Sequence, residues 1–144
     1  MKLYLTTDYA IRIILHLAQH DPRLLPAAET AKRLGLTYSY FNKVASSIKQ
    51  AGFIKSVQGP GGGYRLAQSA KDITLYDIIT AVQGDICINR CLGNGGICSQ
   101  FGSGTVQCSV HRVLETVQND IVHSLKKYSI QDICKMTELQ YVEG

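Results

Sequence analysis

The chain has 144 residues, the length of one ordinary domain or at most two small ones. Hydrophobic residues make up 45%, which excludes a disordered chain, and the low share of charged residues, 18%, predicts that some surface is buried against a second copy of the chain. The net charge of +4 permits nucleic acid as a partner without requiring it. We find no cleavable signal pattern and no apolar stretch approaching a membrane span, so we expect a cytoplasmic protein that does not enter a membrane.

The first part of the chain predicts two helices. Apolar residues at helical spacing indicate a helix over residues 7–20, capped by Thr6 or Thr7. A second, shorter helix is predicted over residues 27–34 and ends at Gly35. The small Ala31 lets a following helix approach closely, which is typical of a helix-turn-helix.

A third helix and a hairpin follow. Thr37 can cap a helix over residues 38–51, whose buried stripe is predicted to be Phe41, Val44, Ala45 and Ile48. Residues 53–58 and 64–67 then have the character of two strands joined by a glycine-rich turn. Three helices and a hairpin in this order predict a mainly α fold with a small β-hairpin wing, a winged helix-turn-helix.

The outward side chains of the third helix suit contact with double-stranded DNA. In a helix-turn-helix this helix lies in the major groove with its N-terminal residues at the base edges. Hydroxyl, amide and ammonium groups can bond to phosphates or bases there. The candidate DNA-binding residues on this helix are Tyr38, Ser39, Tyr40, Asn42 and Lys43. A merely solvated polar face is the plainer alternative, and the hairpin that follows favours DNA.

The glycine-rich turn is a candidate wing tip. Gly59, Pro60, Gly61 and Gly62 are followed by no Gly-Lys-Ser/Thr and by no helix, so this is not a nucleotide cradle. Consecutive glycines allow positive φ and a slim backbone, which would fit a minor groove. Arg65 is placed to bind phosphate nearby.

The remainder of the chain predicts a long helix between shorter ones. Thr74 opens a helix to Val82, and residues 109–127 form the longest amphipathic stretch, with a last helix from Ser129 to Met136. The apolar seam of the long helix has little of its own molecule to pack against, so we expect it to pair with a second copy in a homodimer. We therefore divide the chain into a winged helix-turn-helix (1–84), a cysteine-rich cluster-binding loop (85–108) and a dimerisation helix with a short C-terminal helix (109–144).

Three cysteines ahead of the long helix indicate a metal centre. Six residues separate Cys91 from Cys98, nine separate Cys98 from Cys108, and His111 lies one helical turn beyond Cys108. There is no Cys-x-x-Cys pair, so a zinc ribbon is disfavoured, and widely spaced thiolates suit an iron–sulfur centre with one further ligand of another kind. Cys87 is an additional thiol that can replace Cys91, and Cys134 is interpreted as a small buried hydrophobe.

The sequence resembles the winged-helix iron–sulfur regulators typified by IscR, NsrR and RirA. The resemblance covers nearly the whole chain and rests on Met1-Lys2-Leu3, Thr7-Asp8-Tyr9-Ala10, Ser39-Tyr40, Gly59-Pro60-Gly61-Gly62-Gly63-Tyr64 and the three cysteines. It implies a homodimer with crossing long helices, each cluster lying near the DNA-binding domain of the other chain. It further implies that the state of the cluster changes DNA affinity.

The resemblance offers two fourth ligands. Asp8 matches the aspartate that the NsrR-like branch supplies from the other subunit, and His111 matches the histidine of the IscR-like branch. The Thr7-Asp8-Tyr9-Ala10 match favours Asp8, with His111 as the alternative. Both [4Fe–4S] and [2Fe–2S] clusters are compatible with the spacing.

These features predict a homodimeric, sequence-specific transcription regulator that binds a palindromic promoter site and senses iron, nitric oxide or redox state through an iron–sulfur cluster. A small electron-transfer protein is the alternative from another class, but it would need no helix-turn-helix. A cluster-free regulator with a thiol or zinc switch is a third reading. We find no Ser-His-Asp set and no paired carboxylates, so we do not expect an enzyme.

Overall fold

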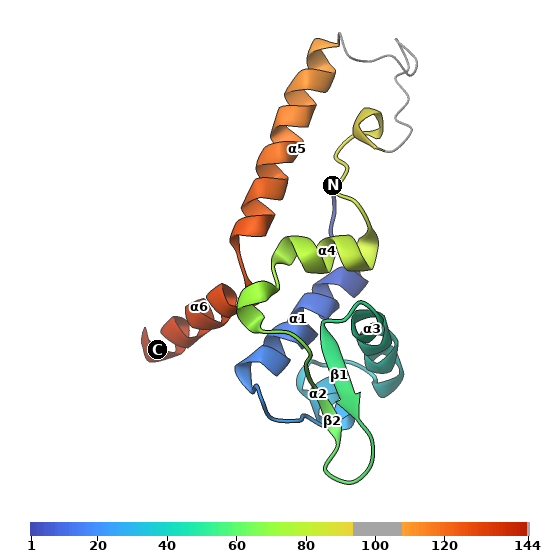
Figure 1. The fold of residues 1–144 in the computed structure, drawn as a ribbon, viewed down its shortest axis with the longest axis vertical. Helices are drawn as coiled ribbons and strands as arrows, with labels where there is room; N and C mark the ends of the chain where they lie inside the picture. The colour runs from blue at the N-terminus through green and yellow to red at the C-terminus, as the bar shows by residue number, and fades with distance from the viewer. Residues whose placement is uncertain (94–107, 144) are drawn as a thin grey trace.

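The structure is a computed structural model that describes residues 1–93 and 108–143; Cys98 lies outside the described residues. Figure 1 shows a group of short helices with a hairpin beneath them, and a long helix that rises away from this group. Among the described residues the elements, in chain order, are α1 (Leu5–Gln19), α2 (Ala27–Arg33), α3 (Tyr38–Gln50), β1 (Ile54–Val57), β2 (Gly63–Leu66), the 3-10 turn η1 (Ala70–Asp72), α4 (Leu75–Gln83), the 3-10 turn η2 (Arg90–Leu92), α5 (Ser109–Lys127) and α6 (Ile130–Glu143). The predicted fold class, mainly helical with a two-stranded wing, is confirmed.

Helix α1 lies at the centre of the core. It packs against α3, α4, α6 and β2, so its buried side is wider than one stripe. Ile13 and Leu17 are fully buried, whereas Ile11 and Leu15 are only half-buried. Because several elements surround α1, its buried face is centred on Ile13 and Leu17.

The start of α1 differs from the prediction. The helix begins at Leu5, and no side chain caps it, so the expected cap at Thr6 or Thr7 is wrong. Thr7 is instead buried, and its hydroxyl donates to Gln83 Oε1 at 2.7 Å. A buried hydroxyl needs a partner, and the end of α4 supplies it.

The helix-turn-helix forms as predicted. Gly35 ends α2 with a φ of 70°, and the backbone N–H of Leu36 donates to Ala31 O at 2.8 Å. The hydroxyl of Thr37 caps α3 by accepting from the backbone of Tyr40 at 3.2 Å. The predicted stripe of α3 is fully buried: Phe41, Val44, Ala45 and Ile48.

The wing is a short antiparallel hairpin. β1 and β2 pair from Ile54–Leu66 at the base to Val57–Gly63 at the tip. The segment before α2 joins the edge of this hairpin, because the backbone N–H groups of Leu25 and Tyr64 each donate to the other's carbonyl at 2.9 Å. The helix-turn-helix and the wing are therefore held together by backbone hydrogen bonds as well as by the core.

The last helix folds back onto the first part of the chain. Ser129 and Asp132 bond reciprocally, each side chain accepting from the other residue's backbone at 3.0–3.1 Å, which begins α6 at Ile130. Ile130 is fully buried in the same core as α1, and α6 extends to residue 143, beyond the predicted end at Met136. The C-terminal helix thus shares its core with residues 1–84.

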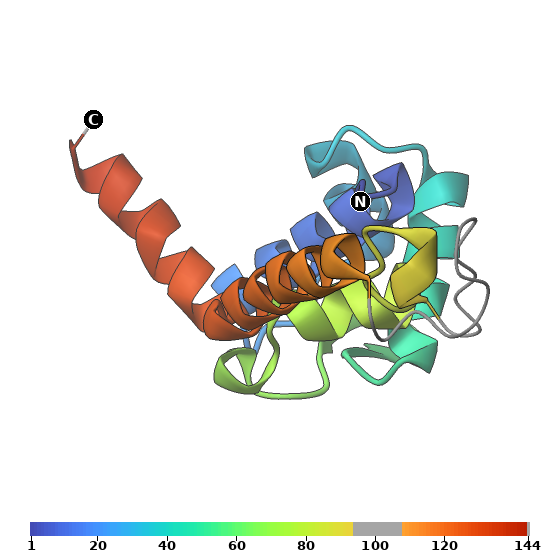
Figure 2. The ribbon, with the colours of Figure 1, turned by 90° about the horizontal axis from the view of Figure 1, so that it is seen from above.

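Helix α5 spans the predicted residues but buries none of its side chains. Among the described elements, α4 and η2 lie beside α5 (Figures 1 and 2). Val110, Val113 and Val117 are 64%, 62% and 43% exposed, while Leu114 and Ile121 are half-buried. One half of the predicted seam is therefore covered by the chain itself, and the valine half is not. No helix in the described part of the chain is long and apolar enough to cross a membrane.

Candidate nucleic-acid interface and metal centre

A groove separates the N-terminal end of α3 from the wing. It has a volume of about 260 Å³ and brings the recognition helix, the wing tip and the start of α2 to one concave surface. The residues that line it are Pro26, Ala27, Tyr38, Asn42, Ser56, Val57, Gln58, Gly59, Gly62, Gly63 and Tyr64. The groove thus brings two of the predicted helix residues, Tyr38 and Asn42, together with two of the predicted wing residues, Gly59 and Gly62.

The predicted contact residues of α3 differ in their exposure. Tyr38, Ser39 and Lys43 are exposed on the first turns of the helix. Asn42 is half-buried where it lines the groove. These four side chains place two hydroxyls, one amide and one ammonium group on one surface. All of these groups can donate hydrogen bonds to phosphates and base edges.

Tyr40 is turned toward α1. Its ring lies edge-on to Tyr9, with the ring centroids 5.8 Å apart, and its hydroxyl lies 3.4 Å from Thr6 Oγ1. The Tyr40 ring packs on the core and holds α3 against α1. Sequence reasoning placed Tyr40 on the outer face because helical spacing alone does not show that α1 covers this part of α3.

The wing glycines are needed for two different reasons. Gly59 and Gly61 have φ values of 90° and 75°, the left-handed region predicted for this turn. Gly62 has no positive φ; a Cβ there would instead collide with the backbone carbonyl of Val57 and lie 2.9 Å from Gly59 O. The turn is closed by a hydrogen bond from Gly62 N–H to Gly59 O at 3.0 Å, and Pro60 is exposed at its tip.

Two cations lie side by side on the hairpin. Lys55 on β1 is directly opposite Arg65 on β2, and neither forms an ion pair within the described ranges. Like charges in opposite positions on paired strands destabilise a sheet. An external anion, such as a phosphate, would relieve this repulsion.

Hydrogen bonds orient the first two cysteines of the cysteine segment. The thiol of Cys87 donates to Asn89 O at 2.8 Å, whereas the sulfur of Cys91 accepts from the Asn89 side-chain amide at 3.4 Å. Asn89 Oδ1 accepts from the backbone of Arg90 at 2.9 Å, which orients the amide toward Cys91. An N–H donor to sulfur stabilises a thiolate ligand, so Cys91 is better prepared than Cys87 to bind a metal.

Both ends of the cysteine segment lie against α5. The side chain of Gln118 accepts from the backbone of Ile88 at 3.0 Å and so holds the first end beside the helix. Cys108, half-buried, is the N-cap residue of α5 at the other end. One turn into the helix, His111 has a buried Nδ1 with no hydrogen-bond partner in the described part of the chain. A buried imidazole nitrogen without a partner is destabilising unless a hydrogen-bonding group or a metal occupies the site.

Asp8 lies in the first turn of α1, directly after a segment that is bound to α4. Gln83, the last residue of α4, accepts from Tyr4 N at 3.0 Å and donates to Lys2 O at 3.1 Å, so the N-terminal segment is tied to the element that leads into the cysteines. The Asp8 carboxylate is 3.1 Å from Arg12 Nε and partly exposed. It is accessible to a second chain.

The described residues do not form a complete metal site. No three of their His, Cys, Asp and Glu side chains come together as a set that could hold a metal ion, and Cys98, the middle ligand of the predicted set, lies outside the described residues. Cys87, Cys91 and Cys108 form no disulfide among the residues described. The donors that are described, thiol sulfurs and an imidazole nitrogen, are of the kinds that can bind an iron–sulfur cluster.

Sequence reasoning missed three polar residues of this region: Asn89, Gln118 and Gln83. Asn89 carries a local signal, because Asn commonly caps a helical turn and this one directly precedes Arg90 and Cys91. Gln118 and Gln83 carry no such signal, since their partners lie 30 or more residues away in the chain.

The sequence and the fold are similar to those of known transcriptional regulators. The profile of Rrf2, described as an iron-dependent transcriptional regulator, matches residues 4–136. The regulator IscR of Photobacterium profundum is 29% identical, and the match covers 100% of this chain and 81% of that protein. The solved structure of T. potens IscR has a TM-score of 0.72 at 26% identity, covering 95% of this chain and 88% of that one.

A second solved structure supports the fold alone. CymR, described as the global cysteine regulator of B. subtilis, superposes with a TM-score of 0.78 at 19% identity over 94% of this chain and 98% of that chain. The chain therefore belongs to the Rrf2 family of transcriptional regulators.

Proposed function

We propose that this regulator acts as a homodimer on a palindromic DNA site and carries an iron–sulfur cluster that controls its affinity for that site. The observation that carries the proposal is the uncovered valine face of α5, directly beside the two described ends of the cysteine segment. Val110, Val113 and Val117 repeat at three and four residues and remain exposed in the single chain. A second copy of α5 would cover this face, and the two-fold symmetry of such a dimer would present two winged helices to a palindrome.

Each winged helix supplies two kinds of DNA contact in this proposal. The first turns of α3 enter the major groove with Tyr38, Ser39, Asn42 and Lys43, while Tyr40 holds the helix in position. The slim tip, Gly59 to Gly62, approaches the minor groove. Lys55 and Arg65 then bind phosphates, which relieves their mutual repulsion on the hairpin.

Cys91, Cys98 and Cys108 are the proposed cluster ligands. The amide donor from Asn89 supports Cys91 over Cys87, whose thiol is engaged as a donor to a carbonyl. Cys108 is the N-cap residue of α5, so a change at its sulfur would shift the start of the helix that also bears the valine face. A bound [4Fe–4S] or [2Fe–2S] cluster would supply a centre that reacts to iron supply, nitric oxide or oxidants.

The fourth ligand is either Asp8 of the second chain or His111 of the same chain. The sequence resemblance favours Asp8, and its exposed carboxylate leaves it accessible to a partner. The buried Nδ1 of His111, one turn beyond Cys108 and without a hydrogen-bond partner among the described residues, supports His111. This second observation is the stronger one, because an orphaned buried nitrogen needs an explanation within the protein, whereas Asp8 already has a partner in Arg12.

The test is anaerobic purification with analysis of iron, sulfide and zinc and a visible spectrum. Cys91→Ala, Cys98→Ala and Cys108→Ala should each lose the chromophore, and Cys134→Ala, whose residue packs against the core, should keep it. His111→Ala should alter the spectrum while Asp8→Ala leaves it unchanged; the reverse result assigns Asp8.

Two outcomes would contradict the cluster. Stoichiometric zinc without sulfide would indicate the zinc switch, and iron and sulfide retained by all three cysteine variants would remove these residues as ligands. DNA binding by α3 and the wing would stand in either case.

A further inference from the structure

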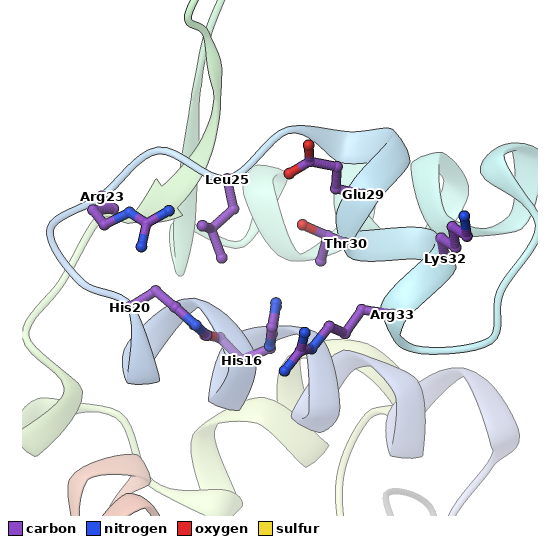
Figure 3. Close-up of a pocket in the computed structure, with 8 residues that line it drawn as sticks. All are labelled: His16, His20, Arg23, Leu25, Glu29, Thr30, Lys32 and Arg33. Atoms are coloured by element: carbon purple, nitrogen blue, oxygen red, sulfur yellow. The ribbon is translucent and has the colours of Figure 1, made fainter.

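A second concave site lies in the winged helix, away from the DNA groove and from the cysteines. It is a cavity of about 560 Å³ between the C-terminal half of α1 and helix α2 (Figure 3). A volume of this size is typical of sites that bind small organic molecules. Its lining residues are His16, His20, Arg23, Leu25, Glu29, Thr30, Lys32 and Arg33.

The cavity does not belong to the DNA groove. The two share no lining residue, although α2 contributes to both. Ala27 faces the groove, whereas Glu29, Lys32 and Arg33 lie on the opposite side of this helix by its 3.6-residue repeat. The cations of the cavity therefore need an explanation other than the proposed contacts of α3 and the wing.

The lining carries an excess of positive charge. Arg23, Lys32 and Arg33 contribute three cations against the single carboxylate of Glu29. None of the four forms an ion pair within the described parts of the chain. Figure 3 shows the guanidinium of Arg33 directed toward His16 across the space between the helices.

The two histidines lie at the base of this cationic surface. His16 and His20 are one turn apart on α1, with ring centroids 4.7 Å apart, and His20 Nδ1 lies 2.9 Å from His16 O. Burial lowers the pKa of His16 below its ordinary value, and the charges of His20 and Arg33 lower it further. An anion in the cavity would offset both charges and favour the protonated ring.

A metal ion is a poorer occupant than an anion. Histidines one helical turn apart are a spacing used by metal sites. Among the described residues, however, no third His, Cys, Asp or Glu comes close enough to complete a set with them. The surrounding arginines and lysine would also repel a cation.

We propose that the cavity between α1 and α2 binds a small organic anion, a molecule whose phosphate or carboxylate groups pair with Arg33 and Arg23 while its apolar part contacts Leu25. Guanidinium groups bind such oxyanions through paired, charge-assisted hydrogen bonds. The space exceeds what an inorganic ion fills, so an organic anion is the occupant. This ligand would be distinct from the cluster and would bind to the DNA-binding part of the regulator.

The experiment is calorimetric titration of the anaerobically purified full chain with citrate, adenosine monophosphate and sulfate. Citrate or adenosine monophosphate should bind more tightly than sulfate, and which of the two binds separates a carboxylate ligand from a phosphate ligand. Arg33→Ala should weaken that binding by about tenfold or more, because it removes a charge-assisted pair. Lys71→Ala, which removes an exposed cation on η1 outside the cavity, is the matched control and should bind as wild type does.

Sulfate also tests the histidines, because its own charge stays constant between pH 5.5 and 7.5. Its binding should be tighter at the lower pH in the wild type, and this difference should shrink in His16→Gln. The proposal is overturned if neither citrate nor adenosine monophosphate binds more tightly than sulfate, or if Lys71→Ala weakens binding as much as Arg33→Ala. It is also overturned if Arg33→Ala leaves probe binding intact and weakens DNA binding, since the cavity would then be a contact for the DNA backbone.

Discussion

The winged region, residues 1–84, and the α5 region, residues 85–127, differ in how far their apolar side chains are buried and their polar atoms are hydrogen-bonded within one chain. In the winged region the apolar faces are buried within one chain: Phe41 and Ile48 of α3 are fully enclosed, and Thr37 caps the helix. In the α5 region no side chain of the helix is buried, and His111 Nδ1 lacks a partner among the described residues. The apolar faces of the winged region are buried within one chain, with Ile130 of α6 in the same core, whereas the described α5 helix leaves its valine face exposed.

The comparison explains how one molecule can both read DNA and respond to a signal. A region closed by its own core keeps one conformation, which presents α3 and the wing as a fixed surface. In the function proposed above, the α5 region depends on a second chain and on a bound cluster, so it changes when either is altered. Helix α4 of the winged region packs against both α1 and α5, with Lys126 Nζ of α5 lying 4.5 Å from the centroid of the Tyr76 ring, so α4 connects the two regions and gives a change at α5 a route to α1.

The largest expected effect comes from Val117→Asp, which tests whether α5 is completed by a second copy. Val117 is exposed in the single chain, so the monomer should keep its melting temperature. In a dimer the carboxylate would be buried without a partner, weakening association by roughly 3–5 kcal/mol. Sedimentation velocity should show monomers, with loss of binding to a palindrome.

Asn119→Asp is the matched control for this experiment. It adds the same charge on the opposite, exposed side of α5 and should leave the protein dimeric. A Val117→Asp variant that stays dimeric would place the interface elsewhere and remove the contrast between the two regions.

The next effect is expected at the wing, and it tests whether the winged region is a fixed surface. Gly62→Ala adds a Cβ that collides with the carbonyl of Val57, so the turn must open and shift its tip. The substitution should cost roughly 0.5–3 kcal/mol of folding stability, and DNA affinity should fall because the tip is displaced. Gly61→Ala adds a methyl group that meets no atom within 4 Å and strains only φ, so it should lose less DNA affinity. Fluorescence anisotropy with labelled DNA measures both affinities. Equal affinity of Gly62→Ala and wild type would show that the tip does not enter DNA.

Lys43→Ala has a smaller effect and tests the contacts of α3. If Lys43 binds phosphate, specific and non-specific affinity should fall together and the salt slope should decrease by about one. If it binds guanine, only the affinity for the specific site should fall, by about 1–3 kcal/mol. Lys49→Ala, in the last turn of the same helix, is the control and should bind DNA normally. Unchanged affinity of Lys43→Ala for both kinds of DNA would exclude Lys43 from the interface.

The smallest effect concerns the cap that attaches α6 to the winged region. Hydrogen bonds from the backbone and hydroxyl of Ser129 lower the pKa of Asp132 below its ordinary value of 3.8. A lowered folded-state pKa means that this stabilisation is present above pH 3.8 and is lost as pH falls through the folded-state value. Asp132→Asn should therefore lower the melting temperature slightly at pH 7, and the difference from wild type should vanish in acid. A difference that persists at acid pH would assign the effect to something other than the carboxylate charge.

Much of the fold could be predicted from the sequence, because the signals that define it are local. The buried stripe of α3, the Thr37 cap, the positive φ of Gly59 and Gly61 and the span of α5 each depend on residues within a few positions of one another. The cysteine spacing and the Cys108–His111 step likewise named candidate ligands without any coordinates. These ligand assignments stay predictions, since Cys98 lies outside the described residues.

Other features were decided only by tertiary structure, because they depend on partners far away in the chain. Helical spacing placed Tyr40 on the outer face, but α1 supplies Tyr9 and Thr6 and turns the ring inward. The requirement for glycine at 62 arises from the carbonyl of Val57 across the turn rather than from φ. The cationic cavity exists only because α1 and α2 pack with His16 and Arg33 on facing sides. Local sequence patterns determine which segments form helices and turns, whereas non-local packing decides which of their side chains remain available to a ligand.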